Sequence, residues 1–324
     1  MTLPESRRLD FTEIPILDIG PLLAGNHDTS LIDDLYRACA DIGFLYVTNH
    51  GVPLTLIESL RHSAQAFFSS PMPDKMKIII DARIRGYYPP NRSYSAANLI
   101  EGEDRAGTSH KEGFWIGHER PVCNDALLHG PNQWPVDYPD LRQSMMKYFH
   151  AVEELAGVLL RGFALALKLD EQCFDSLFLK PMTSLLLNHY PPQDNPTAHN
   201  DIGLVPHADA GGFTILWQDD SGGLEIQNKK GEWVIAPPME GTFVINIGNV
   251  MQTWTNGRFS STPHRVINRS NRDRYSIPLF VNPSYDVTVK PLVDIDRKHS
   301  VAFNYGAYQR DVWRQTFPIA EIPS

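Results

Sequence analysis

Hydrophobic positions along the chain change their spacing near residue 180. Before that point, apolar residues recur at helical spacing over Leu31–Ile42, Leu54–Phe68 and Leu141–Leu169, which predicts three helices. Gly43 is placed to end the first helix, and two prolines in the SPMPDK segment break the chain after the second. The third helix is apolar around much of its circumference. We therefore expect it to be a buried spine against which a sheet packs.

After Lys180 the pattern changes to short strands separated by Gly, Pro, Asn and Asp, which is typical of a β-sandwich or barrel. A double-sheet jelly roll is the natural closed form. Two earlier segments, Ile14–Ile19 and Phe44–Pro53, also read as strands. The later segments are LLLNHY, FTILWQ, GLEIQN, EWVIAP, TFVINI, HRVINR and RYSIPLFV. The predicted fold class is α+β, with a double-stranded β-helix core and flanking helices, one of them long and packed on the sheet.

The length and composition favour one globular domain over residues 1–324. The chain has 324 residues, of which 42% are hydrophobic and 21% charged, so it can bury a full-sized core. We expect a mainly helical part with a few strands over residues 1–180. The jelly-roll core should cover residues 181–285, followed by a C-terminal extension over 286–324.

Charge and cysteine content exclude several classes of partner. The formal net charge is −9 and no Lys/Arg block is present, so we expect no nucleic-acid partner. Cys39, Cys123 and Cys173 lie far apart, which suits reduced thiols. No apolar run is long enough for a signal peptide or a membrane span. We expect a cytoplasmic protein without a membrane partner; no pattern in the chain specifies an oligomeric state.

Candidate chemistry lies in the strand-rich half. His207 and Asp209 are separated by one residue, so extended backbone places both on one face, and His264 opens a later strand that could reach the same point from across the barrel. Two imidazoles and a carboxylate form the facial triad that binds iron(II) and leaves further positions open. Arg274 and Ser276 share one face of a strand and can grip a carboxylate together.

A His-x-Asp triplet is common by itself, and most histidines are structural, so the order and context of these residues carry the specificity. The HExxH, P-loop and GxSxG patterns are absent, which leaves zincin, nucleotide-hydrolase and serine-hydrolase interpretations without support.

In this context the chain resembles the iron(II)/2-oxoglutarate dioxygenase superfamily, in its isopenicillin N synthase-like branch. The N-terminal IPILDI, GFLYVTNHGVP and EGFWIG segments take part in the resemblance, which covers nearly the whole chain. The other matching segments are NHYPP (188–192), PHADAGGFTILWQDDSGGLEI (206–226), GEWVIAPPMEGTFVINIGN (231–249), NGRFSSTPHRV (256–266) and RYSIPLFVNP (274–283).

The resemblance implies a role for each matching residue. His207, Asp209 and His264 match the ligands of Fe(2+). Arg274 and Ser276 match the pair that holds the distal carboxylate of 2-oxoglutarate. Tyr190 matches a tyrosine that supports this carboxylate, and Asn188 a residue near the chelating end of the cosubstrate. The implied reaction consumes dioxygen and couples oxidative decarboxylation of 2-oxoglutarate, to succinate and CO2, to oxidation of a small molecule, most often by hydroxylation.

Two alternatives stay open at this point. An iron(II) oxidase of the isopenicillin N synthase type uses the same triad without 2-oxoglutarate, and its Arg-x-Ser pair grips the substrate itself. A metal-binding jelly roll without catalysis is the second alternative, although the intact ligand set argues against it.

The resemblance implies that the irregular stretch from Arg83 to Phe114 overlies the mouth of the iron site. This stretch is interpreted either as a mobile lid over the substrate or as an exposed, solvated loop. The stretch carries four arginines and three tyrosines, which suits a small molecule with an anionic or polar group and an apolar or aromatic body. Candidate substrate-contacting residues are Tyr94, Phe114, Trp217 and Phe280.

Overall fold

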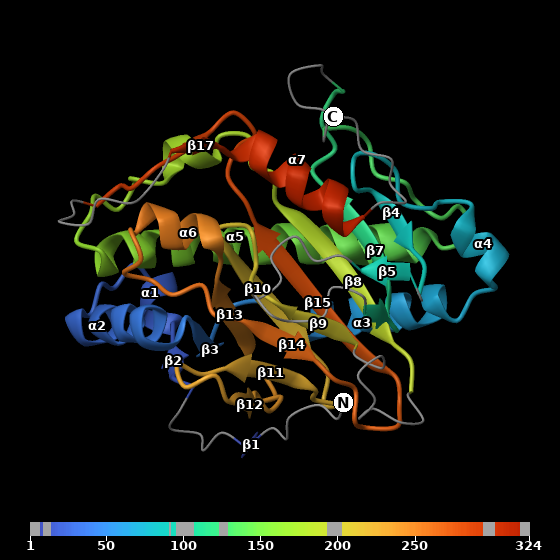
Figure 1. Ribbon diagram of the computed structural model, residues 1–324, viewed down its shortest axis with the longest axis horizontal. Coiled ribbons are helices and arrows are strands. Elements are labelled where there is room, and N and C mark those ends of the chain that lie inside the picture. Colours follow the sequence, from blue (N-terminus) through green and yellow to red (C-terminus); the bar gives the residue numbers. More distant parts are fainter. Residues whose placement is uncertain are drawn as a thin grey trace.

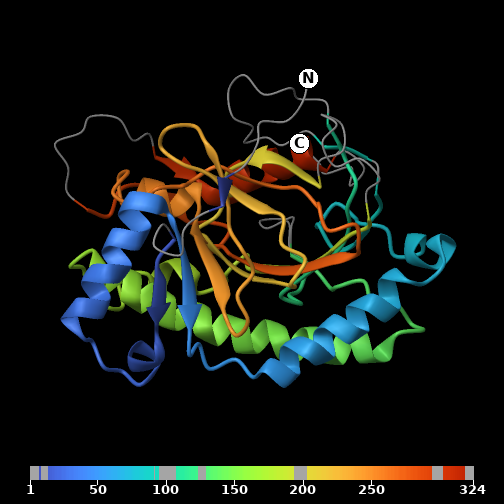
Figure 2. The ribbon, with the colours of Figure 1, turned by 90° about the horizontal axis from the view of Figure 1, so that it is seen from below.

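Two β-sheets face each other at the centre of the molecule, and long helices cover the outer side of the larger one (Figures 1 and 2). The computed structural model describes residues 7–8, 14–90, 92–94, 107–122, 129–192, 203–293 and 302–317. The larger sheet has the strand order β2-β3-β13-β10-β15-β8-β7-β4, and the smaller one β1-β12-β11-β14-β9. Together they form a jelly roll, which confirms the predicted fold class.

All seven strands predicted after Lys180 are present. Three more among the described residues, β9, β16 and β17, were not predicted, because β9 shows no alternation and the other two have only two residues each. The larger sheet contains, in its order, β2 (Ile16–Asp18), β3 (Phe44–Thr48), β13 (Phe243–Ile247), β10 (Phe213–Gln218), β15 (Arg274–Val281), β8 (Ser184–Tyr190), β7 (Glu112–Gly117) and β4 (Gly86–Tyr88). The smaller sheet contains β1 (Arg7–Arg8), β12 (Trp233–Ile235), β11 (Leu224–Gln227), β14 (His264–Val266) and β9 (Leu204–His207). Two short ladders pair β5 (Arg92–Tyr94) with β6 (Gly107–Ser109) and β16 (Thr288–Val289) with β17 (Phe303–Asn304).

Helix α5 (Pro139–Ala166) is the predicted spine. It runs the length of the molecule beneath the larger sheet, beside α3 (Leu54–Phe68), as Figure 2 shows. Its Phe163 ring meets Phe213 of β10 edge-on at 5.2 Å, and the prediction of a long helix packed on the sheet is confirmed. The remaining helices are α1 (Gly20–Leu23), α2 (Thr29–Arg37), α4 (Met72–Met76), α6 (Asn249–Trp254), α7 (Tyr305–Thr316) and a 3-10 turn, η2 (Asp175–Phe178).

Two helix predictions need correction in detail. The helix expected over Leu31–Ile42 is α2 followed by a π-helical turn, η1 (Ala38–Ile42), and Gly43 ends it at a φ of 75°. The SPMPDK segment does more than break the chain, because it begins α4 with Pro73 in the first turn, where proline needs no hydrogen-bond partner.

Residues 84–89 of the predicted lid are buried. They include β4, which pairs with β7, and Arg85, Tyr87 and Tyr88 are each less than 5% exposed. This part is therefore neither a lid nor a solvated loop. The sequence pattern did not predict a strand here, because β4 has only three residues, too few to show alternation. Arg105 lies outside the described residues, as does the side chain of Arg92.

The faces of the larger sheet differ in chemistry. Ile215, Ile277 and Leu279 point to the helices and belong to the main hydrophobic core. On the other face, Thr214 of β10 lies between Asn246 of β13 and Phe280 of β15 in register, in a row that lines the space between the sheets. Strand alternation therefore separates the core from a pocket.

Cys39 and Cys173 are free thiols, and Cys123 lies outside the described residues. None of the described helices combines the length and apolar character needed to cross a bilayer.

Candidate iron and cosubstrate site

His207, Asp209 and His264 meet in the pocket between the two sheets. One candidate ligand atom of each lies within 4.8 Å of the others. His207 ends β9 and His264 begins β14, and the two are directly paired in an antiparallel ladder, with ring centroids 4.3 Å apart. His264 therefore arrives from the adjacent strand, which corrects the expectation that it reaches across the barrel. Asp209 lies in the loop after β9.

Hydrogen bonds orient all three side chains. Thr214 Oγ1 and Asn246 Nδ2 both donate to Asp209 Oδ2, the latter at 2.7 Å. Asp209 Oδ1 is left facing the Nε2 atoms of His207 and His264, at 3.7 and 3.8 Å.

A backbone carbonyl group orients each imidazole through its Nδ1 atom. His207 Nδ1 lies 2.8 Å from the Val205 carbonyl, and His264 Nδ1 lies 3.2 Å from that of Thr262. A carbonyl accepts only, so Nδ1 carries the proton and the lone pair of Nε2 points into the shared space. The donor set thus fits a divalent transition metal: two neutral imidazoles and a carboxylate, each held by a second partner.

Burial and the neighbouring groups favour a neutral His207 and an ionised Asp209. Burial, aided by His264, lowers the pKa of His207 to about 3, so the imidazole stays neutral. Burial alone would raise the pKa of Asp209, but the two imidazoles and the bonds from Thr214 and Asn246 lower it overall.

The π-helical turn η1 holds the segment that leads into His264. Thr262 Oγ1 donates to the Ile42 carbonyl, and Ser260 Oγ donates to that of Ala40 at 2.9 Å. A Cβ on Gly43 would lie 2.0 Å from the Ser260 carbonyl oxygen, so no larger residue fits there. Glycine is therefore required at this position for two reasons: the positive φ and the close approach of the Ser260 carbonyl.

The four predicted cosubstrate residues lie together on the pocket face of the larger sheet. Arg274 pairs in register with Tyr190, and Ser276 with Asn188. The Arg274 guanidinium lies 4.7 Å above the Tyr190 ring, and Asn188 Nδ2 donates to Ser276 Oγ at 3.3 Å. We call Asn188, Tyr190, Arg274 and Ser276 the cradle.

Arg274 is poised for an anion. Its Nε donates to the Gly222 carbonyl and its Nη2 to Gln218 Oε1, whereas Nη1 is buried without a hydrogen-bond partner among the described residues. A buried guanidinium nitrogen needs an acceptor, and a carboxylate of a bound molecule would supply one.

Lys111 also lines this pocket, and sequence reasoning missed it, because a single lysine before a strand has no diagnostic context. Its Nζ donates to Asn188 Oδ1 at 2.9 Å and lies 6.0 Å from the centre of the Tyr190 ring. Burial and the charge of Arg274 lower the pKa of Lys111 to about 7, against the opposing effect of Asp209.

The predicted substrate residues are divided between the two faces of the sheet. Phe280 lines the pocket and stacks on Trp115, with centroids 5.4 Å apart. Phe114 points to the opposite face and packs on Phe67, and Trp217 lines a separate surface depression beside Tyr275. The pocket-facing residues are their neighbours Trp115 and Leu216. The side chain of Tyr94 lies outside the described residues.

Helix α7 also lines the pocket. The sequence analysis assigned no role to this segment. An amphipathic pattern over α7 is the signal that was available. Its pocket-lining residues, with Phe317 just beyond it, are Gln309, Val312, Trp313, Thr316 and Phe317. Ser184 and Asn282 line the pocket from the sheet, and Ser184 Oγ and Asn282 Oδ1 are buried without a partner among the described residues.

Comparisons with known proteins agree with this geometry. Residues 182–283 match the 2OG-Fe(II) oxygenase superfamily, and residues 14–137 match the N-terminal region named for a non-haem dioxygenase in morphine synthesis. This chain belongs to the 2OG-Fe(II) oxygenase superfamily. The 2-oxoglutarate-Fe(II) type oxidoreductase hxnY of Emericella nidulans is 35% identical over 87% of this chain and 82% of its own. A homoarginine-6-hydroxylase of Glycine max is 35% identical over 87% of this chain and 89% of its own.

The fold has solved counterparts. A Neurospora crassa protein in complex with alpha-KG and thymine superposes with a TM-score of 0.79 and 26% identity, over 93% of this chain and 96% of the other. The protein is therefore an enzyme that requires Fe(2+), 2-oxoglutarate and dioxygen, and it couples decarboxylation of 2-oxoglutarate to oxidation of a small molecule.

Proposed function

We propose that His207, Asp209 and His264 bind the iron, and that the cradle binds 2-oxoglutarate beside it. The observation that carries this assignment is the buried Nη1 of Arg274, which faces a pocket shared with the triad. Arg274 and Ser276 grip the distal carboxylate, Tyr190 supports it, and Asn188 lies toward the chelating end. We further propose that residues 1–324 act as one catalytic domain, because β2, β3, β4 and β7 extend the sheet that carries the cradle.

When bound, iron(II) and 2-oxoglutarate supply the oxidising chemistry with dioxygen. The chain contributes position and charge. Asp209 offsets part of the metal charge, and Thr214 and Asn246 hold its carboxylate so that Oδ1 faces the ligand space. Arg274 neutralises the distal carboxylate in a fork that a point charge cannot reproduce. The apolar surface of the pocket excludes water from the reacting atoms.

The substrate end of the pocket suits a compact, planar molecule that is hydroxylated next to the iron. Trp115 and Phe280 provide a flat aromatic wall, and residues of α7 line the pocket beside it, with Phe317 against Trp115. Ser184 Oγ and Asn282 Oδ1 are available to hydrogen-bond the polar edge of such a molecule. The thymine in the Neurospora crassa complex has this shape, a flat ring with polar edges.

Anaerobic titration with 2-oxoglutarate tests the assignment of the cradle. The iron(II)-loaded protein should develop a weak visible charge-transfer band, and Arg274→Ala should raise the dissociation constant roughly 10- to 100-fold, since a hydrogen bond to a charged group is lost. Arg274→Lys should recover only part of this loss.

Arg161→Ala, at an exposed arginine of α5, is the matched control and should bind like wild type. Unchanged affinity in Arg274→Ala would overturn the assignment. A panel of planar heterocycles, scored by stimulated succinate release, then tests the substrate class.

A further inference from the structure

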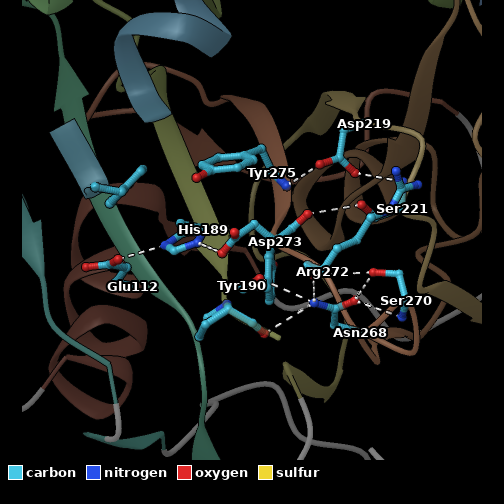
Figure 3. A network of polar contacts seen from close by, with 12 residues as sticks. Glu112, His189, Tyr190, Asp219, Ser221, Asn268, Ser270, Arg272, Asp273 and Tyr275 are labelled. Atoms are coloured by element: carbon cyan, nitrogen blue, oxygen red, sulfur yellow. Dashed lines mark hydrogen bonds and ion pairs between the residues drawn. The ribbon is translucent and has the colours of Figure 1, made fainter. Parts of the chain in front are cut away.

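Behind the cradle, on the opposite face of the same strands, lies a second group of charged side chains. Figure 3 shows His189 between Glu112 and Asp273, with the ring of Tyr275 beside it. We call Glu112, His189 and Asp273 the bridge. His189 Nδ1 lies 2.7 Å from Glu112 Oε1, and its Nε2 lies 2.6 Å from Asp273 Oδ1. The imidazole stacks on Tyr275 at 4.9 Å, with only 14° between the ring planes.

The geometry defines the charge of His189. An ionised carboxylate can only accept hydrogen bonds, so each ring nitrogen must donate, and both carry a proton only in the imidazolium form. The bridge therefore joins β7, β8 and the start of β15 through one cation and two anions.

Each member of the bridge is next in sequence to a residue of the pocket. Glu112 follows Lys111, His189 separates Asn188 from Tyr190, and Asp273 precedes Arg274. Neighbouring residues of a strand project to opposite faces, so a side chain fixed on one face fixes the direction of the next on the other. The strand register also links the bridge to the sheet, because Glu112 of β7 and Tyr275 of β15 both pair with His189 of β8.

We propose that the bridge positions the cradle, and that protonated His189 is needed for tight binding of 2-oxoglutarate. The inference rests on the proposed role of the cradle. His189, Glu112 and Asp273 are positioning residues, since none of them lines the pocket.

The surroundings set the direction of the pH dependence. Burial alone would lower the pKa of His189, but the bonds to Glu112 and Asp273 outweigh it and raise this pKa. The bridge is therefore complete below the ordinary imidazole pKa of about 6.5 and is lost as the pH rises through the raised value.

Other aromatic, charged and hydroxyl groups face the bridge from the elements packed around it. Phe68 of α3 lies 5.4 Å from the His189 ring. Lys75 of α4 donates to Glu112 Oε2 at 2.7 Å, and Tyr87 also donates to it. Asp219 accepts from the Tyr275 amide at 2.6 Å. Lys111 titrates on the pocket face, so the wild-type profile contains its contribution as well.

The experiment measures the dissociation constant of 2-oxoglutarate on the anaerobic iron(II) protein, by the charge-transfer band, from pH 6 to pH 9. His189→Gln keeps one hydrogen bond and removes the charge, and His62→Gln, at an exposed histidine of α3, is the matched control. Loss of an outer hydrogen-bonding partner typically costs roughly 10-fold or more, so we expect His189→Gln to bind 2-oxoglutarate about 10-fold more weakly at pH 6. The loss should shrink as the pH rises, because wild type loses the bridge as the His189 imidazole deprotonates.

Asp273→Asn is the second variant, at a side chain that is 55% exposed and tolerates change. It removes one anion from His189, so the fall in affinity should begin at a lower pH than in wild type. A constant ratio between His189→Gln and wild type at every pH, or equal affinities, would overturn the proposal. If wild type itself does not bind 2-oxoglutarate, the proposed function fails instead.

Discussion

The two faces of the larger sheet are built from the same strands but differ in the polarity of their buried side chains. On the helix side, Ile277 and Leu279 are almost fully buried against other apolar side chains. On the pocket side, the alternate residues of the same strand include Arg274 and Ser276, which are equally buried but polar. Burial of polar groups costs free energy unless a partner is present. The helix face therefore provides stability, and the pocket face holds groups whose partners come from bound molecules.

The largest effect is expected from the only carboxylate of the triad. Asp209→Ala should abolish iron binding and succinate formation, because it removes the anionic ligand and leaves Thr214 and Asn246 without their acceptor. Iron content after anaerobic loading is the measurement. Asp33→Ala, at an exposed aspartate of α2, is the control. Normal iron content in Asp209→Ala would show that the metal lies elsewhere.

A cavity on the helix face should act on stability alone. Leu279→Ala should lower the free energy of unfolding by about 2–5 kcal/mol, as buried leucine truncations do. Urea denaturation gives this value, and below the transition the folded fraction should still bind 2-oxoglutarate with wild-type affinity. A large loss of cosubstrate affinity in the folded protein would mean that the apolar packing around Leu279, and not the bridge alone, positions the cradle.

Ser276, a pocket-facing residue of the same strand, should show the reverse behaviour. Ser276→Ala should leave the urea midpoint nearly unchanged and weaken 2-oxoglutarate binding roughly 10-fold, the lower end of the range for one hydrogen bond to a charged group. The same two assays as for Leu279→Ala decide it. Destabilisation without a change in affinity would make Ser276 a structural residue.

The smallest effect is expected at Trp217, which the sequence placed at the substrate and the structure places at a separate depression. Trp217→Phe should leave substrate-stimulated succinate release within about 2-fold of wild type. Phe280→Ala, on the pocket wall, should reduce it well beyond that. Equal losses in the two variants would restore Trp217 as a substrate residue.

The sequence predicted the features that depend on local pattern. The helices over α3 and α5, the strands of the jelly roll and the turn at Gly43 all follow from periodicity and backbone preference. The triad and the cradle were found through motifs in which order and spacing are fixed. These residues lie together in the structure as expected.

The features that the sequence could not predict depend on which face of a strand a residue occupies and on contacts between distant segments. Phe114 and Trp217 are aromatic residues on strands that border the pocket, but a strand has two faces, and their neighbours Trp115 and Leu216 face the pocket. Lys111 and the bridge of Glu112, His189 and Asp273 join segments far apart in the chain, and no local pattern marks them. The amphipathic pattern of α7 predicts a helix with one buried face, but not that this face lines the pocket.

An anaerobic crystal structure of the protein with iron(II) and 2-oxoglutarate tests the central claim most directly. We predict iron at about 2 Å from Nε2 of His207 and His264, as imidazole–metal bonds require, with Oδ1 of Asp209 as the third protein ligand. The distal carboxylate of 2-oxoglutarate should accept from Nη1 of Arg274. Iron at any other set of side chains, or a cosubstrate that leaves Arg274 Nη1 without an acceptor, would contradict the account.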